Sequence, residues 1–192
     1  YTVLNAISVA ATITPRPLAV SGSGVTKVYD GTTSMDNVTV DLVAVPGQTE
    51  SGLIDGQSLS VTGGEGAFDS PDAGTGVGYQ LASTTDNPLV IASGTGTAAS
   101  NYSIPGGGTT TIAGNDGVIY QRPLAITFTG DTRDYDGTTD ATVSESFANS
   151  SYAPVDGDDL TINRTAVFDN KNVGSGSTRV AVSAVSLSGG DA

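Results

Sequence analysis

The sequence of 192 residues contains no cysteine, no histidine and no tryptophan. Without histidine and cysteine the chain can build neither a Ser-His-Asp nor a Cys-His catalytic site, and the usual zinc ligand sets are missing. Without cysteine no disulfide can stabilise the fold. Each folded unit must therefore bury enough apolar surface on its own, which about 90–100 residues can do.

Basic residues and long hydrophobic runs are also scarce. Seven Lys and Arg stand against 20 Asp and Glu, which gives a net charge of −13. This charge repels nucleic acid and anionic membranes, so we expect neither as a partner. No apolar run is long enough for a membrane-spanning helix. The glutamates are only Glu50, Glu65 and Glu145, and none lies in an apolar segment that would favour a catalytic acid. We therefore expect no catalytic residues and no enzyme.

A set of short motifs occurs twice in the same order. Residues 16–20 (RPLAV) recur as residues 122–126 (RPLAI), and residues 29–33 (YDGTT) recur identically as residues 135–139, both 106 residues later. Further pairs follow at spacings of 101 and 100: Asp55-Gly56 with Asp156-Gly157, Ala67-Phe68-Asp69 with Val167-Phe168-Asp169, and residues 73–76 with 173–176. The spacing shrinks within polar or Gly-rich stretches, as loop insertions on a shared framework do.

The repeat predicts the domain organisation. Residues 15–117 form a first module and residues 118–192 a second, which we expect to lack its last strand. Residues 1–14 are predicted to be the terminal strand of a preceding repeat, because Tyr1-Thr2-Val3 resembles Tyr102-Ser103-Ile104. The prolines at the entry to the first module favour a stiff, extended connection.

Apolar residues alternate with polar ones along most of the chain, as in Val38/Val40/Leu42, Leu160/Ile162 and Val180/Val182. This period of two is typical of strands with one buried face, and Gly, Asn, Asp and Pro clusters separate the strands. We predict an all-β protein of two tandem β-sandwich (Ig-like) modules in an extended arrangement, with a β-grasp-like variant as the alternative. A change of phase at Ser183-Ala184 predicts a β-bulge.

One segment is ambiguous. Residues 142–152 begin with a Thr-x-x-Glu pattern and place Val143 and Phe147 at helical spacing. The corresponding residues 38–42 of the first copy are typical of a strand. We favour a strand in both copies.

The segment 27–33 (KVYDGTT), together with residues 13–18 (ITPRPL) and residues 169–174 (DNKNVG), resembles the YDG-type repeat domains of filamentous-haemagglutinin-like and other giant surface adhesins of Gram-negative bacteria. The resemblance covers nearly the whole chain. It implies secreted, tandemly repeated, non-enzymatic modules at the bacterial cell surface. Their partners would be neighbouring repeats of the same chain and, for the adhesin, a glycan or a host or biofilm surface.

The Tyr-Asp-Gly-Thr-Thr motif has a structural interpretation. Tyrosine can plug the end of a sandwich, aspartate can bond backbone amides in an Asx turn, and glycine supplies a positive φ. We therefore predict a turn with a packed tyrosine rather than a ligand site.

Other residues are candidates for metal binding or covalent modification. Asp156, Asp158, Asp159 and Asp169 could offer oxygen ligands to calcium, although the spacing fits no EF-hand loop and the first copy has fewer carboxylates. Lys27 and Lys171 could form isopeptide bonds. Four Asn-x-Ser/Thr triplets begin at Asn37, Asn101, Asn149 and Asn163. We favour ordinary structural roles for all of them and expect no cofactor.

We expect the modules to serve as stalk repeats that space and present adhesive regions in attachment or biofilm. The alternative is a carbohydrate-binding module, in which exposed Tyr79, Tyr120 or Tyr152 would hold sugars. An incomplete sandwich also leaves an open sheet edge. Residues 1–7 could fill that edge in a neighbouring molecule and give a strand-swapped oligomer.

Overall fold

The computed structural model describes residues 9–35, 39–105, 111–174 and 178–190. Its regular elements are strands, apart from two short 3₁₀ helices at Ala99–Asn101 and Ser150–Tyr152. No helix among the described residues is long and apolar enough to cross a membrane. The predicted all-β, sandwich-like class is confirmed.

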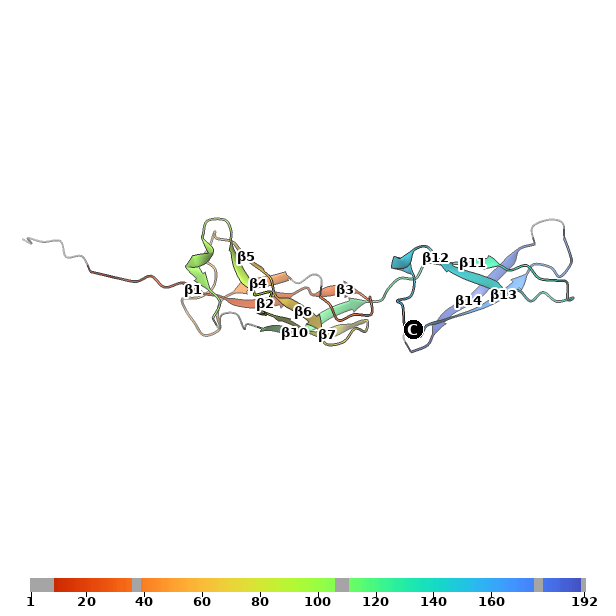
Figure 1. Cartoon of the computed structure of the whole chain (residues 1–192), viewed down its shortest axis with the longest axis horizontal. Helices are drawn as coiled ribbons and strands as arrows, with labels where there is room; N and C mark the ends of the chain where they lie inside the picture. Colours follow the sequence, from red (N-terminus) through yellow and green to blue (C-terminus); the bar gives the residue numbers. More distant parts are fainter. Residues whose placement is uncertain (1–8, 36–38, 106–110, 175–177, 191–192) are drawn as a thin grey trace, which may run out of the picture. The chain divides into compact units, whose positions relative to one another are not determined.

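Contacts divide the chain into two compact units (Figure 1). Unit 1 contains Tyr1–Lys27 and Thr32–Tyr120, and unit 2 contains Val28–Gly31 and Gln121–Ala192. Tyr29, Asp30 and Gly31 of the first YDG motif therefore group with unit 2, and Thr32 and Thr33 with unit 1. The module boundaries inferred from the repeat stay predictions.

Unit 1 is built on a four-stranded sheet with the order β3-β10-β7-β6. Three further strand pairs complete it: β2 with β4, β5 with β8, and the parallel pair of β1 with β9. The strands are β1 Arg16–Pro17, β2 Ala19–Ser23, β3 Thr26–Val28, β4 Thr39–Val43, β5 Leu59–Thr62, β6 Glu65–Phe68, β7 Gly74–Ala82, β8 Val90–Ser93, β9 Tyr102–Ser103 and β10 Thr111–Tyr120.

The core of unit 1 lies on the inward positions of these strands. In β10, Ile112 and Ile119 are buried, whereas Asn115 and Asp116 between them are exposed. The two isoleucines lie an odd number of residues apart, so the register shifts around Gly117 bring the second one back to the buried face. The buried apolar side chains of the unit are Leu18, Val25, Phe68, Tyr79, Leu81, Tyr102, Ile112 and Ile119. They come from segments that are far apart in the sequence, so the core forms only when distant strands pair.

Tyr79 is the largest fully buried side chain, with 2% of its surface exposed. Its ring packs directly on backbone, because a Cβ on Gly114 would lie 2.4 Å from the ring Cζ and a Cβ on Gly22 would lie 3.1 Å from Cε2. Burial first, and then the hydrogen bond and charge of Asp116, raise the pKa of Tyr79. The two glycines are therefore required by the volume of the ring.

Unit 2 repeats part of this arrangement with four strands. β11 pairs with β12, and β13 pairs with β14, both antiparallel. The strands are β11 Ile126–Gly130, β12 Val143–Phe147, β13 Thr161–Phe168 and β14 Val180–Ser188. The ambiguous segment 142–152 is thus a strand followed by a single 3₁₀ turn, as favoured from its counterpart in the first copy.

The predicted bulge is present in β14. The ladder with β13 shifts register between Asn163 and Thr165, and Ala184 adopts a φ of 53°. A residue in the left-handed region absorbs the extra position on the bulged strand.

Matching strands pair in matching register. β2 and β4 of unit 1 correspond to β11 and β12 of unit 2, and β6 and β7 correspond to β13 and β14. In the first strand pair, Val20 faces Leu42 in unit 1 and Ile126 faces Phe147 in unit 2. In the second strand pair, Phe68 faces Tyr79 in unit 1 and Phe168 faces Val180 in unit 2. The sequence repeat is therefore also a structural repeat.

The units differ after these strands. In unit 1, β8, β9 and β10 follow β7, whereas no strand follows β14 in the part of unit 2 that the structure describes. Only Gly189 and Gly190 follow β14 in this part, so the expectation that the second module lacks its last strand stays a prediction.

The terminal strand predicted for residues 1–14 falls largely on residues 1–8, outside the described part. Residues 9–14 form no regular secondary structure and are exposed. The assignment of this segment to a preceding repeat stays a prediction.

The Tyr79 packing gives a first prediction. Gly114→Ala should destabilise the protein by about 1–3 kcal/mol, because the new methyl group and the ring cannot share one space. Urea unfolding followed by circular dichroism measures the change. The control is Gly74→Ala in the same sheet, whose Cβ would meet nothing closer than 3.7 Å. Equal effects of the two substitutions would contradict this account.

Candidate functional site

The arginine of the Arg-Pro motif holds a distant loop in unit 1. Arg16 donates from Nε to the carbonyl of Gly52 at 2.8 Å and from Nη2 to the carbonyl of Ser51 at 2.8 Å. Its Nη1 also meets Glu50 at 2.9 Å, but that carboxylate is largely exposed and its ion pair contributes little. Two main-chain carbonyls are thus fixed by one planar group.

The same contact occurs in unit 2. Arg122 donates from Nε to the carbonyl of Ala153 at 2.7 Å and from Nη2 to the carbonyl of Ser150. Each arginine therefore joins the start of its unit to a loop about 30 residues later in the chain. We call this pair of contacts the arginine clamp, formed by Arg16 in unit 1 and Arg122 in unit 2.

A cation also closes each YDG turn. Lys27 Nζ donates to the carbonyl of Thr32 at 2.9 Å, and Arg133 Nη2 donates to the carbonyl of Thr138 at 2.6 Å. Lys27 and Arg133 lie 106 residues apart, as do the two threonines. The two cations therefore play one role, although their side chains differ.

Within the second turn, Asp136 and Gly137 behave as predicted. The backbone N–H of Thr138 donates to Asp136 Oδ1 at 2.8 Å, which is an Asx turn, and Gly137 has a φ of 81°. The hydrogen bonds from the backbone and the hydroxyl of Thr138 come first among the causes that lower the pKa of Asp136, and Arg133 adds to them. The predicted tyrosine plug is wrong for this turn, because Tyr135 is 62% exposed.

The last threonine of each motif ties the turn to the sheet. The N–H of Phe68 donates to the carbonyl of Thr33 at 2.7 Å, and the N–H of Phe168 donates to that of Thr139 at 2.8 Å. An isolated β-bridge lies next to each of these bonds. It joins Ser34 to Ala67 in the first copy and Asp140 to Val167 in the second. The Phe-Asp motif is Phe68-Asp69 in the first copy and Phe168-Asp169 in the second. In each copy the YDG motif supplies the acceptor and the Phe-Asp motif the donor of one backbone hydrogen bond.

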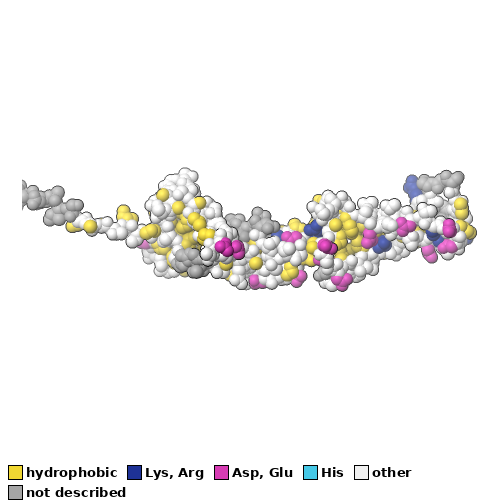
Figure 2. All heavy atoms as spheres, in the orientation of Figure 1, with side chains coloured by type: hydrophobic (Ala, Val, Ile, Leu, Met, Phe, Trp, Pro, Cys, Tyr) yellow, Lys and Arg dark blue, Asp and Glu magenta, His cyan; other side chains and the backbone are white. Residues whose placement is uncertain are grey.

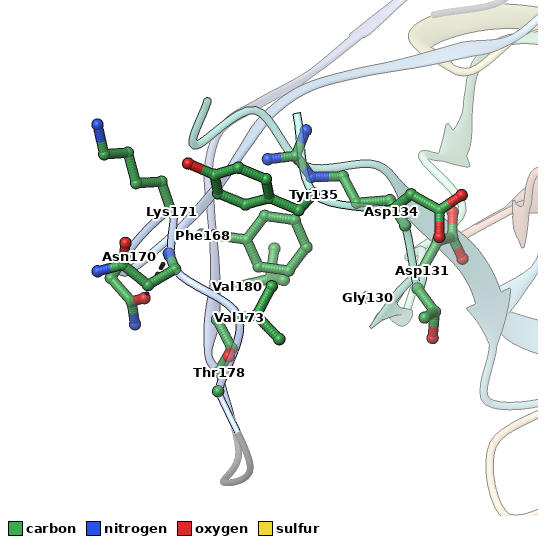
Figure 3. A pocket seen from close by; sticks show the side chains of 14 residues that line it. Gly130, Asp131, Asp134, Tyr135, Phe168, Asn170, Lys171, Val173, Thr178 and Val180 are labelled. Carbon is green, nitrogen blue, oxygen red and sulfur yellow. Dashed lines mark hydrogen bonds between the residues drawn. The ribbon is translucent and has the colours of Figure 1, made fainter. Parts of the chain in front are cut away.

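Unit 2 has an open groove of about 660 Å³ (Figure 3). One wall is the segment from Gly130 to Tyr135, and the other contains Phe168, Thr178 and Val180. In Figure 3 the apolar side chains gather at the centre, while Lys171 points away from it. The guanidinium of Arg133 lies 5.2 Å from the ring centre of Phe168.

The structure does not gather the aspartates considered for calcium. Among the described residues, no group of three or more Asp, Glu, His or Cys side chains could hold a metal ion. Asp159 accepts a hydrogen bond from Gly190 N–H and Asp169 accepts one from Asn170. Figure 2 shows acidic side chains scattered over the visible face of both units.

The other candidates have local roles. Lys27 serves the YDG turn, and Lys171 is exposed. Asn101 and Asn149 bond residues close to them in sequence, and Asn163 donates to the hydroxyl of Ser188 on the paired strand β14. Asn37 lies outside the described residues.

Of the tyrosines considered for sugar binding, Tyr120 and Tyr152 are exposed as expected. Tyr79 is buried, so its assignment to an exposed site was wrong. It is buried because two glycines make space for its ring, and the sequence distance between Tyr79 and Gly114 hides this relation.

Sequence reasoning also missed the arginine clamp and the shared role of Lys27 and Arg133. A signal was available for both. Both contacts are made by basic residues that lie at the same distance before the motif tyrosine in the two copies. The chain has only seven basic residues, so this coincidence is a usable signal.

Together, the paired registers, the clamps and the tied turns define an all-β protein made of two copies of one structural repeat. A family model for the YDG domain matches residues 14–113 and 120–192, so the chain belongs to the YDG domain family. No curated protein and no solved structure matches the chain.

The arginine clamp gives a second prediction. Arg122→Lys and Arg122→Ala should each lower the stability of the protein by about 1–3 kcal/mol, because an ammonium group cannot span the two carbonyls and alanine leaves both unpaired. Thermal unfolding measures the loss. Arg179→Ala removes the same charge from an exposed position and should have little effect. Full stability of Arg122→Lys would contradict the bidentate role.

The lowered pKa of Asp136 gives a third prediction. The ionised carboxylate is stabilised in the folded state, so its contribution is present above the unfolded pKa near 4 and is lost as the pH falls through the lower folded pKa. Asp136→Asn should therefore flatten the dependence of melting temperature on pH below about 4. The neighbouring Asp134→Asn serves as the control. An unchanged pH profile in Asp136→Asn would refute the assignment.

Proposed function

We propose that the chain is a pair of structural stalk modules from a large secreted adhesin on the surface of a Gram-negative bacterium. The modules would space and present adhesive regions during attachment or biofilm formation. The secreted, bacterial context comes from the motif resemblance stated above, and membership of the YDG domain family is consistent with it.

One observation carries the proposal: basic residues and threonines at matching positions of the two copies bind main-chain groups of their own unit. Arg16 and Arg122 hold loop carbonyls, Lys27 and Arg133 hold turn carbonyls, and the motif threonines accept from phenylalanine N–H groups. A repeated catalytic or ligand site would instead direct its recurring side chains at a shared hollow. The recurring residues thus support a role in shape and stability.

The composition supports the same role. The fold is achieved without disulfides or cysteine thiols, and the net charge of −13 keeps the surface well hydrated and resists unspecific association. These properties suit a module that is repeated many times in one extracellular chain.

A carbohydrate-binding module is the second candidate, favoured by the groove of unit 2. Its lining contains the exposed ring of Tyr135 beside Asp131, Asp134 and Asn170, a combination of an aromatic face with polar groups that suits a sugar. The experiments below separate the two candidates.

Our fourth prediction concerns mechanical resistance. Pulling the whole chain from its two ends by atomic force microscopy should give discrete unfolding events, because each unit is held by contacts between distant segments. Arg122→Ala should lower the unfolding force of one event, while Arg179→Ala should not. Unfolding without a measurable force would contradict a load-bearing stalk.

The matched binding experiment uses a glycan array. We expect no specific binding by the chain. Saturable binding that is lost in Tyr135→Ala and retained in Tyr152→Ala would instead establish the carbohydrate-binding function. Antibody labelling of intact cells of the source bacterium tests the surface location, and labelling only after lysis would overturn it.

A further inference from the structure

The first Tyr-Asp-Gly turn groups with unit 2 and is held by three residues of that unit. The hydroxyl of Tyr29 donates to Asp158 Oδ1 at 2.9 Å, and Arg122 Nη1 donates to the carbonyl of Tyr29 at 3.5 Å. Gly31 lies directly on Val155, because a Cβ at this glycine would come 3.0 Å from Val155 Cγ1. The arginine, the valine and the aspartate therefore form a binding site for a Tyr-Asp-Gly turn, which we call the turn site of unit 2.

Unit 1 has the same site in an exposed form. At the repeat spacings of 106 and 101 residues, the counterparts of the three residues are Arg16, Ile54 and Gln57. All three line one hollow of about 430 Å³, and we call them the turn site of unit 1. Ile54 is 49% exposed, whereas Val155 is half-buried. The backbone is also alike, since the N–H of Gln57 donates to the carbonyl of Ile54 as that of Asp158 donates to that of Val155.

The side chains of the turn site of unit 1 suit the same ligand. Ile54 offers an apolar surface on which a glycine can pack. Gln57 Oε1 accepts from the hydroxyl of Tyr102 at 2.5 Å, and this bond orients the amide so that its Nε2 can donate to another tyrosine hydroxyl. Arg16 Nη1 meets Glu50, whose side chain is 88% exposed, so a carbonyl can replace that carboxylate at little cost.

Unit 2 presents a second turn of the same shape. Gly31 and Gly137 have φ values of 76° and 81°, and in both copies a cation holds the carbonyl of the threonine that follows. Tyr29 is half-buried and bonded to Asp158, whereas Tyr135 is 62% exposed. The chain therefore carries one turn bound to its site, and also one exposed turn and one exposed site.

We propose that the turn site of unit 1 binds a Tyr-Asp-Gly turn, and that residues 135–137 of a second copy of this chain occupy it. Tyr135 then reaches Gln57 as Tyr29 reaches its aspartate, and the glycine of the turn packs on Ile54. The two surfaces differ, so the contact is heterologous and copies join head to tail into open chains or closed rings. This proposal concerns how modules recognise one another and does not depend on the stalk function.

Two variants test the two surfaces separately. Ile54→Asp places a charge where the glycine packs and disables the site, whereas Tyr135→Ala disables the turn. In sedimentation velocity, the mass of the natural chain should rise with concentration, while each variant alone stays monomeric. An equimolar mixture of the two variants should form dimers and no larger species, because the first variant keeps its turn and the second keeps its site.

Matched controls separate lost association from lost folding. Ile54→Val reproduces the side chain of unit 2 and should retain association. Tyr152→Ala removes another exposed tyrosine ring of unit 2 and should retain it as well. Ile54 and Tyr135 are both exposed, so the melting temperatures of Ile54→Asp and Tyr135→Ala should stay close to that of the natural chain.

Three results would overturn the proposal. They are a natural chain that stays monomeric at every concentration, association that survives in either disabled variant, and a mixture of the two variants that remains monomeric.

Discussion

The backbone contact between the YDG turn and the Phe-Asp strand is the constraint on which each unit depends. It joins the carbonyl of Thr33 to the N–H of Phe68, and that of Thr139 to the N–H of Phe168, across more than 25 residues of intervening chain. Main-chain groups make this bond, and the motif shapes the turn that presents the threonine carbonyl. Glycine with positive φ forms the turn, and a cation in front of the tyrosine holds the first threonine carbonyl.

The arginine clamp applies the same principle at the start of each unit. A guanidinium group satisfies two loop carbonyls that would otherwise need water, and it does so with a geometry that lysine cannot copy. Both copies have arginine at this position, Arg16 and Arg122. The turn cation is lysine in one copy and arginine in the other, and the Lys27 ammonium reaches the carbonyls of Thr32 and Ser34, so a point charge is sufficient in the turn.

Much of the architecture could be predicted from the sequence. The period of two, the duplicated motifs and the phase change at Ser183-Ala184 identified the strands, the repeat and the bulge, because these features are local or repeated. The environment of Tyr79 could not be predicted, since its glycine neighbours lie on strands that approach it only in the folded sheet. Tyr135 was expected to be packed because the motif is compatible with a turn that carries a buried tyrosine. The motif does not determine whether another segment supplies an apolar surface to cover the ring.

The exchange of Tyr79 in one copy for Val180 in the other has a genetic consequence. Duplicated segments are prone to unequal recombination, and a crossover located between β7 and β10 would separate a tyrosine ring from the glycines that accommodate it. One hybrid would carry valine beside Gly114 and lose the ring that packs on that glycine, while the opposite hybrid would carry Tyr79 without Gly114. Crossovers at the Arg-Pro junctions avoid both defects, so viable changes in copy number should occur in whole units.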